Sequence, residues 1–488
     1  MLLKQRLLLM RRPYAILFFG TTDFAIMPAF MTRRLFMNSR FRLAIFAIVC
    51  LFAMKAAAVD APANLPATDW LQWRGPTATG EAAPDAKPPL SWSEDTNIRW
   101  KIAIPGRGRS TPIIWKDRIF ITTAVQTDTP VDPEKVKAAM DATPEFARKG
   151  AHVPEKVLQF VVMALKRSDG SVLWRKTVCE QAPLAGTHAD GSWASGSPIT
   201  DGESLYAYFG SYGLYAMTLD GEKKWSKDLG TFKTKANFGE GVSPVLCGDL
   251  LIINQDFEGP SFIVALDRKT GEEKWRVKRD EATSWSTPLI IQHGGKQQIV
   301  VSATNRIRSY NPEDGAILWE IGGMTGNVVP CPITDGNLVF CMSGFRGNAL
   351  FAIKLAAAGG ELAGKPEAMA WSSKTNTSYV PSPVLSGGLL YYIKANEGFL
   401  TCADATTGQV NYAAKLDGLQ TVFASPIAAG GHLYVPGKNG LTLVLKLGPK
   451  FELIASNQLN DEIISSPAVV GNELFLRGDK NLYCITGK

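Results

Sequence analysis

The fold of this 488-residue chain is decided by a repeating unit that residues 243–275 contain in full, SPVLCGDLLIINQDFEGPSFIVALDRKTGEEKW. The unit opens with Ser243-Pro244 and an apolar run, and it turns at Cys247-Gly248-Asp249. A second apolar run, Leu250 to Asn254, follows the turn. Short apolar runs separated by Gly and Asp are typical of β-hairpins, so we expect antiparallel strands here.

The opening of this unit recurs along the chain. A small residue followed by proline introduces an apolar run eight times, at Thr111-Pro112, Ser197-Pro198, Ser243-Pro244, Thr287-Pro288, Cys331-Pro332, Ser382-Pro383, Ser425-Pro426 and Ser466-Pro467. The first two prolines lie 86 residues apart, and the later steps are 41–51 residues. Four strands in about 45 residues is the spacing of β-propellers rather than of helical solenoids.

A second pattern keeps step with the first. A glycine turn is followed four residues later by an aromatic residue, at Gly170 and Trp174, Gly221 and Trp225, Gly271 and Trp275, Gly315 and Trp319, and Gly408 and Tyr412. The eighth unit ends after its third strand, residues 481–485, and lacks the Trp-bearing fourth strand. A strand predicted at residues 97–101, before the first unit, contains Trp100, as the missing fourth strand should. Its pairing into the last blade would cover two strand edges that are otherwise free.

We therefore expect an all-β fold, an eight-bladed β-propeller of four-stranded antiparallel blades, closed by an N-terminal strand that pairs into the last blade. The expected domains are residues 1–58, an N-terminal extension with a secretory signal peptide, residues 59–96, an N-terminal segment, and residues 97–488, the propeller. The long first step leaves room for a helical insertion at 126–156, with a short helix after Pro133.

The net charge of +7 comes from the leader. Residues 1–58 hold nine Lys and Arg against one Asp, a net of +8, so the remaining residues carry −1. Because residues 59–488 are nearly neutral, they have no excess of positive charge with which to bind phosphate backbones, and this excludes nucleic acid as a partner.

Residues 40–58 have the features of a signal peptide: basic Arg40 and Arg42, an apolar run from Leu43 to Met54, and the small residues 56–58. A membrane anchor is the alternative, but the run is shorter than the roughly 20 residues that span a bilayer. Cys50 lacks the small neighbour that acylation needs, and Met31 or Met37 is a more sensible start than Met1. We expect export to a periplasmic or extracellular location.

The six cysteines after the leader show no zinc or haem spacing, and no two are adjacent. Most are expected to be buried small hydrophobes, and a single cross-strand disulfide between Cys331 and Cys341 remains open. The four histidines, His152, His188, His293 and His432, form no local metal motif, so no metal site is assigned.

Residues 265–275, ALDRKTGEEKW, have the form A-x-D-x-x-T-G-x-x-x-W, and Asp404, Thr407, Gly408 and Tyr412 repeat it. This pattern resembles the tryptophan-docking repeat of the pyrroloquinoline quinone (PQQ)-like propeller superfamily. The resemblance covers most of the chain after the leader. It implies that each Trp stacks between neighbouring blades, while the glycine lets the backbones approach closely.

The resemblance implies one of two kinds of function. One branch contains quinoprotein alcohol dehydrogenases that hold PQQ and Ca²⁺ in a central funnel, commonly beneath a vicinal Cys-Cys disulfide. The other contains non-catalytic propellers similar to the BamB-like assembly factor of the outer-membrane β-barrel machinery. This chain has no Cys-Cys pair and no c-type haem motif, which favours the BamB-like branch, although it also lacks a lipobox cysteine.

Polar and aromatic residues gather in three loops at blade edges: residues 187–196, 254–258 and 284–286. Trp193, Trp285, Asp256 and Glu240 are the candidate cofactor-binding residues of a funnel that stacks a planar or sugar ring and holds a cation through Asp256 or Glu240. Ordinary loop capping, with Trp packed between blades, is the alternative that we favour. No catalytic residue is assigned, because a Ser-His-Asp set from 188–195 has no oxyanion-hole motif beside it.

The favoured function is an exported, non-enzymatic scaffold, a monomer that binds proteins or cell-envelope polymers, does not span the membrane in its mature form, and carries no cofactor. The alternative is a PQQ- and Ca²⁺-dependent oxidoreductase acting on alcohols or sugars, which needs Asp and Glu or Asn to converge in the funnel beneath a stacking Trp. A carbohydrate-active propeller is the third hypothesis, suggested by the aromatic and acidic loops alone.

Overall fold

The computed structural model describes residues 69–394 and 398–487. The chain divides into two units, Met1–Ala58 and Val59–Lys488, and all the described residues belong to the second. The predicted signal peptide therefore lies outside the described residues. Within the described ranges, no helix has the length and apolar character needed to cross a membrane.

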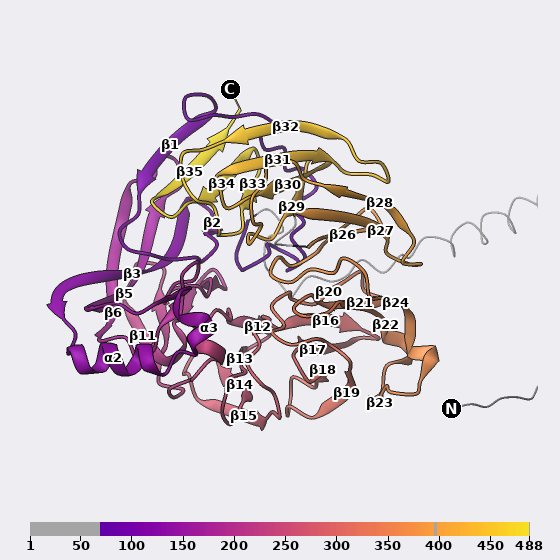
Figure 1. The fold of residues 1–488 in the computed structure, drawn as a ribbon, viewed down its shortest axis with the longest axis horizontal. Helices are drawn as coiled ribbons and strands as arrows, with labels where there is room; N and C mark the ends of the chain where they lie inside the picture. Colours follow the sequence, from indigo (N-terminus) through magenta and orange to yellow (C-terminus); the bar gives the residue numbers. More distant parts are fainter. Residues whose placement is uncertain (1–68, 395–397, 488) are drawn as a thin grey trace, which may run out of the picture. The chain divides into compact units, whose positions relative to one another are not determined.

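Eight four-stranded antiparallel blades surround a central axis (Figure 1). Blades one to four consist of β2 (Ile113–Trp115), β3 (Arg118–Pro130), β5 (Lys156–Lys166) and β6 (Val172–Gln181); β8 (Ile199–Thr200), β9 (Ser204–Tyr208), β10 (Leu214–Thr218) and β11 (Lys223–Lys227); β12 (Val245–Cys247), β13 (Leu250–Gln255), β14 (Phe262–Asp267) and β15 (Glu273–Lys278); and β16 (Leu289–His293), β17 (Lys296–Ser302), β18 (Arg306–Tyr310) and β19 (Ile317–Gly322).

Blades five to eight consist of β20 (Ile333–Thr334), β21 (Leu338–Ser343), β22 (Ala349–Lys354) and β24 (Met369–Ser373); β25 (Val384–Ser386), β26 (Leu389–Lys394), β27 (Phe399–Asp404) and β28 (Val410–Lys415); β29 (Ile427–Ala429), β30 (His432–Pro436), β31 (Leu441–Lys446) and β32 (Leu453–Gln458); and β33 (Ala468–Val470), β34 (Glu473–Arg477), β35 (Asn481–Thr486) and β1 (Ile98–Ala103). In each blade the first strand in this order lies nearest the axis.

The last blade confirms the predicted closure. Strand β1 pairs antiparallel with β35, so the N-terminal strand supplies the missing outer strand of blade eight. The predicted all-β, eight-bladed propeller is therefore the observed fold. The first and last blades also contact each other through their inner strands, β2 and β33, so the ring of blades is closed.

The strands differ in burial according to their place in the blade. Central strands such as β14 are buried on both faces and are continuously apolar, because neighbouring blades cover both sides. Outer strands such as β15 alternate exposed and half-buried residues with the period of two that strand geometry dictates. The hydrophobic core is consequently divided among the seams, as where Tyr206 and Ala216 of blade two pack with Leu251 and Val264 of blade three.

The tryptophan docking that the repeat implies is present at five seams. Each indole N–H donates to a backbone carbonyl of the next blade: Trp100 to Arg167, Trp174 to Leu219, Trp225 to Arg268, Trp275 to Pro312 and Trp371 to Ala405. Each ring also covers the glycine of that blade's turn: Gly170, Gly221, Gly271, Gly315 and Gly408. Trp100 belongs to β1, so the closing strand also locks blade eight to blade one.

The remaining elements lie outside the four-stranded blades. They are α2 (Pro133–Asp141), α3 (Glu145–Arg148), β4 (Ala151–His152), β7 (Thr187–His188), β23 (Gly360–Glu361) and the 3₁₀ turns η1 (Gly210–Tyr212), η2 (Lys235–Asn237), η3 (Leu355–Ala357) and η4 (Pro366–Ala368). The helices α2 and α3 lie in the connection between β3 and β5, and β4 in the same connection pairs with β7. Strand β23 adds to the outer edge of blade four in parallel with β19.

All six cysteines of the propeller are free thiols. The disulfide left open between Cys331 and Cys341 is therefore absent. Five of the cysteines are buried, as expected of small hydrophobic residues, and Cys179 is half-buried.

Candidate functional site

A ring of hydrogen bonds around the axis joins the residues that precede the repeated prolines. In seven of these eight residues, the main-chain N–H donates to the side chain of the equivalent residue in the next blade. The links run from Thr111 to Ser197 (2.9 Å), Ser243 (2.9 Å), Thr287 (3.1 Å), Cys331 (3.2 Å), Ser382 (3.0 Å), Ser425 (2.8 Å) and Ser466 (2.9 Å). The Thr111 hydroxyl closes the ring by donating to the Ser466 carbonyl at 3.1 Å.

One end of the channel inside this ring is crossed by residues 69–92, which we call the strap. Trp70 forms a bridge with Ile114 in blade one, and the Ala82 N–H donates to the Ala428 carbonyl in blade seven at 2.8 Å. Between these two attachments, the buried Arg74 donates to the carbonyls of Pro426 (2.6 Å) and Pro383. Burial lowers the pKa of Arg74 to about 10. The strap thus leaves the channel open to ligands from the opposite end.

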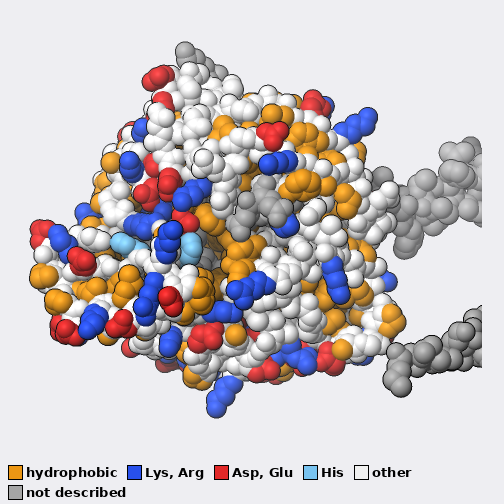
Figure 2. Space-filling model, in the orientation of Figure 1, with side chains coloured by type: hydrophobic (Ala, Val, Ile, Leu, Met, Phe, Trp, Pro, Cys, Tyr) orange, Lys and Arg blue, Asp and Glu red, His pale blue; other side chains and the backbone are white. Residues whose placement is uncertain are grey.

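That opposite end is a hollow of about 450 Å³, at the centre of the face seen in Figure 2. Trp73 of the strap lines it, together with six of the ring residues. The residue two positions before each ring residue lines it as well, and these are Arg109, Ser195, Gly241, Trp285, Val329, Val380, Phe423 and Ile464. Residues two apart in extended backbone point to the same side, so every blade contributes one such residue, which in blade three is the glycine Gly241.

Arg109 is the charged member of this set, and its side chain is 5% exposed. Its Nε donates to the Asp190 carbonyl at 3.1 Å, and its Nη1 lies 2.8 Å from Asp479 Oδ1. Its Nη2 has no hydrogen-bond partner among the described residues. Burial lowers the pKa of Arg109, and the Asp479 carboxylate partly offsets this.

A second guanidinium stands behind the first. Arg477 is 1% exposed and donates through Nη1 to the Ser110 carbonyl and hydroxyl, at 3.2 and 2.5 Å. Burial and the repulsion of Arg109 lower the pKa of Arg477 to about 9. Two guanidinium groups therefore lie on this side of the hollow, with one carboxylate, that of Asp479, paired to Arg109.

The rim joins blades that are not neighbours. Lys438, in the turn after β30, lies 2.7 Å from Asp190 Oδ1 and 3.9 Å from Glu462. The imidazole of His188 meets the Phe238 ring edge-on with centroids 5.1 Å apart, and burial lowers the pKa of His188. Basic and histidine side chains gather along one side of the hollow (Figure 2).

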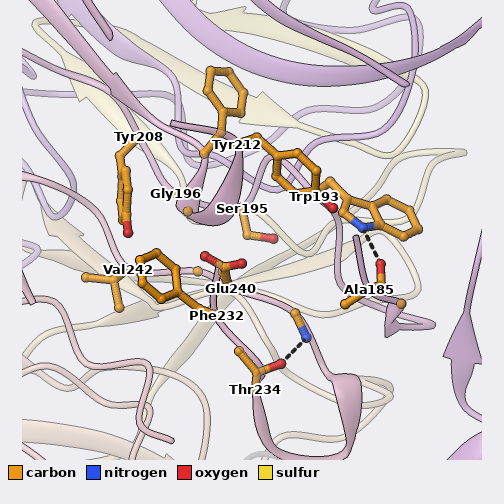
Figure 3. Close-up of a pocket in the computed structure, with 15 residues that line it drawn as sticks. Ala185, Trp193, Ser195, Gly196, Tyr208, Tyr212, Phe232, Thr234, Glu240 and Val242 are labelled. Carbon is orange, nitrogen blue, oxygen red and sulfur yellow. Dashed lines mark hydrogen bonds between the residues drawn. The ribbon is translucent and has the colours of Figure 1, made fainter. Parts of the chain in front are cut away.

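Glu240 lies between the hollow and a small side pocket (Figure 3). Its carboxyl group accepts the Ser211 N–H at 2.8 Å and the Ser211 hydroxyl at 2.6 Å, and it is surrounded by Tyr208, Tyr212 and Phe232. Burial raises the pKa of Glu240 to about 8, so the group is mostly a neutral acid at pH 7.

The four candidate residues from the sequence lie in three environments. Trp285 lines the hollow, and its indole N–H donates to the Gly239 carbonyl at 2.8 Å. Trp193 lines the side pocket with Glu240, faces His152 at 5.5 Å, and donates to the Ala185 carbonyl at 3.0 Å (Figure 3). Asp256 lines neither cavity.

Asp256 is instead held in the protein interior. Its Oδ1 lies 2.7 Å from Arg279 Nε with both side chains fully buried, and its Oδ2 accepts from Ser284 Oγ at 2.6 Å. Asn254 Nδ2 donates to the same Oδ2 at 3.1 Å. Both carboxylate oxygens are therefore engaged within the fold, so this residue acts as a structural anion.

Arg109, Trp73 and Lys438 were not among the site residues predicted from the sequence. A usable signal was nevertheless present for Arg109, because it stands two residues before Thr111-Pro112, as Trp285 stands two before Thr287-Pro288. Trp73 and Lys438 reach the site through the strap and a turn, and no repeat position marks them.

A PQQ–Ca²⁺ site, the alternative raised by the resemblance, does not fit these residues. It needs carboxylate and amide oxygens that converge beneath a stacking Trp. Beside Trp285 the hollow offers Glu240, which is mostly neutral, and Asp190, which pairs with Lys438. Within residues 69–394 and 398–487, no group of three or more His, Cys, Asp or Glu is arranged to hold a metal ion.

Comparisons with known proteins agree with the repeat pattern. The family model described as outer membrane protein assembly factor BamB matches residues 159–414. BamB from Moraxella catarrhalis matches with a TM-score of 0.50 and 14% identity, over 75% of this chain and 98% of that one. No curated protein matches the chain.

Enzymes are similar in structure as well. A quinohemoprotein alcohol dehydrogenase from Pseudomonas putida HK5 matches with a TM-score of 0.56 and 11% identity, over 88% of this chain and 83% of that one. A europium-containing methanol dehydrogenase matches with a TM-score of 0.58 and 10% identity, over 86% and 98% of the two chains. At these identities, the likeness shows the fold alone.

Proposed function

Because the chain belongs to the family of the outer membrane protein assembly factor BamB, we propose that it is an exported binding scaffold without catalytic activity. It works in the periplasm or outside the cell, as a monomer without a resident cofactor, and its partners are envelope proteins or polymers. The hollowed face, with its rim of loops from several blades, is the docking face.

The single observation that carries this proposal is the composition of the hollow. It combines aromatic side chains, hydroxyl groups and one buried guanidinium, and the described residues hold no group of three or more His, Cys, Asp or Glu arranged to bind a metal ion. Recognition needs such a surface, whereas a quinone-dependent oxidation needs a metal-bound cofactor and a base.

Site-specific photocrosslinking in the envelope of an expressing bacterium tests the docking face. A benzoylphenylalanine replaces Glu462, an exposed residue of the rim, or Glu203, an exposed residue in the turn between β8 and β9 at the strap end. We expect discrete crosslinked species from position 462 and none from position 203. Equal crosslinking from both positions, or crosslinks from 203 alone, contradicts the proposed face.

Calorimetry separates the scaffold from the oxidoreductase. Titration of PQQ with Ca²⁺ into the folded protein is expected to release no binding heat, because Asp256 is sequestered by Arg279. Saturable binding at micromolar or lower concentration overturns the scaffold proposal in favour of the quinoprotein alternative.

A further inference from the structure

Four buried serine hydroxyl groups of the ring line the hollow and have a proton free to donate. Ser197, Ser243, Ser425 and Ser466 each accept a main-chain N–H from the preceding blade, and none donates its own proton to another described residue. A hydroxyl group that accepts one hydrogen bond still has its own proton to donate. The floor of the hollow therefore presents hydrogen-bond donors from blades two, three, seven and eight.

The wall adds a stronger donor. Arg109 is ion-paired with Asp479 through Nη1, but its Nη2 is buried without a hydrogen-bond partner, and a buried donor of this kind is costly unless a ligand satisfies it. Arg477 behind it adds positive potential. Asp479 pairs with Arg109 through Nη1 at 2.8 Å, Asp190 is paired with Lys438, and burial raises the pKa of Glu240 to about 8, so these acids leave Arg109 Nη2 without a partner.

Aromatic surfaces complete the hollow. Trp285 and Phe423 stand on the walls, and Trp73 lies at the strap end. The flat apolar faces of such rings can pack against the apolar C–H faces of sugar rings. A volume of about 450 Å³ is in the range of small-ligand sites, and the open mouth lets a longer chain leave towards Lys438 on the rim.

We propose that this hollow binds a uronic acid residue of an acidic envelope polysaccharide, with its carboxylate on Arg109 Nη2, its ring against Trp285, and its hydroxyl oxygens on the ring serines. Acceptor oxygens spread around a six-membered ring match donors spread around the channel, and the carboxylate supplies the charged oxygen that guanidinium groups prefer. The inference rests on the proposed scaffold function and names the partner class of its docking face.

Calorimetric titration of the full chain, expressed with its leader and purified from the host, tests the proposal. The probe is an oligogalacturonate, compared with its methyl ester, which has the same rings and no charge. A chelator is present so that divalent cations cannot bridge the sugar to the protein. We expect saturable binding of the acid, and binding at least tenfold weaker for the ester. No binding of the acid, or equal binding of both, overturns the proposal without requiring any variant.

Two variants locate the site. Arg109→Gln is expected to weaken binding of the acid at least tenfold and to abolish the preference for acid over ester. Arg107→Gln is the matched control, because Arg107 also faces Asp479, at 3.8 Å, but does not line the hollow. An effect of the Arg107 change equal to that of the Arg109 change contradicts the assignment.

Failure of the saccharide proposal can be distinguished from failure of the scaffold function. Crosslinks at position 462 to a protein, with no binding of the oligogalacturonate, leave the docking face standing and refute the saccharide. Binding of PQQ with Ca²⁺ and no crosslinks at 462 refute the scaffold itself.

Discussion

The main-chain N–H of Ser425 in blade seven donates a 2.9 Å hydrogen bond to the hydroxyl of Ser466 in blade eight. Both residues precede a proline, which restricts them to extended backbone and leaves that N–H as the local donor towards the next blade. The Ser-Pro repeat therefore serves two ends at once. It starts each inner strand, and it ties that strand to its neighbour around the axis.

This link predicts an unequal effect of two adjacent substitutions. Ser466→Ala removes the acceptor and leaves the buried Ser425 N–H unsatisfied, which costs about 1–3 kcal/mol of the free energy of unfolding. Ser465→Ala is the control, because the buried Ser465 hydroxyl has no partner in the described structure, so its removal is expected to be neutral or stabilising. Urea unfolding of both variants measures the difference, and equal losses would contradict the role given to the ring.

The contact between Trp275 and Gly315 gives a second prediction. A Cβ on Gly315 would lie 2.7 Å from Trp275 Cε3 and 2.7 Å from Val277 Cγ2, and the residue has φ of +74°. Gly295 has φ of +76° with no atom within 4 Å of its Cβ position. Alanine at either site costs about 1–2 kcal/mol through the left-handed backbone.

Only Gly315→Ala adds overpacking against the docked indole, expected to cost a further 1–3 kcal/mol or so. The measurement is the free energy of unfolding of the two alanine variants relative to the parent chain. A Gly295→Ala variant as unstable as Gly315→Ala would show that backbone strain alone, and not close packing against the indole, accounts for the need for glycine at Gly315.

The fold was predictable because its determinants are local and repeated. Trp275 follows Gly271 by four residues in one copy as in the others, and strand β1 carries Trp100 where the last blade lacks a tryptophan. The repeat length therefore indicates four strands in each blade, the eight copies indicate eight blades, and the incomplete last copy identifies the closing strand. The Ser-Pro motif was visible too, but its hydroxyl bonds cross from blade to blade over 41–86 residues and show no pattern within one unit.

The site was predictable only in part, because it is assembled from single residues of many blades. Trp285 and Arg109 hold equivalent positions two residues before a ring residue, and only the ring geometry shows that this position faces the hollow. Asp256 looked accessible in a polar loop, yet Arg279, 23 residues later and on the far side of β14 and β15, returns to neutralise it. Ion pairs of this kind depend on the packed structure, and no regular spacing in the sequence indicates them.

The buried Arg279–Asp256 pair gives a third prediction. Arg279→Met leaves an uncompensated buried carboxylate and is expected to cost about 3–5 kcal/mol in the free energy of unfolding. The double change Arg279→Met with Asp256→Leu removes both charges and is expected to recover much of that loss. Lys176→Met is the control, because its pair with Glu222 is exposed and contributes under about 1 kcal/mol. A double variant no more stable than the single one would contradict the buried-charge explanation.

Glu240 gives a fourth prediction, on pH. Burial raises its pKa from 4.5 to about 8, and no cation pairs with it among the described residues, where Ser211, Tyr208 and Tyr212 are its polar neighbours. A carboxyl group whose pKa is higher in the fold than in the unfolded chain contributes stability that is fully present below about 4.5, and this contribution is lost as the pH rises through about 8. The free energy of unfolding is therefore expected to decline between pH 5 and pH 9 through this group.

Glu240→Gln keeps the size and the hydrogen-bond acceptor but cannot ionise, so its decline over the same range is expected to be smaller than that of the parent chain. Asp190, His188 and Arg109 also line the hollow and are present in both proteins, so the difference between the two curves isolates Glu240. Between pH 6 and pH 9 the same variant is expected to lose less affinity for the oligogalacturonate than the parent, in which Glu240 becomes an anion beside the ligand. The loss of charge from Arg477, whose pKa is about 9, is common to both proteins. Parallel stability curves, together with an equal loss of affinity in both proteins, would assign the pH dependence to another group.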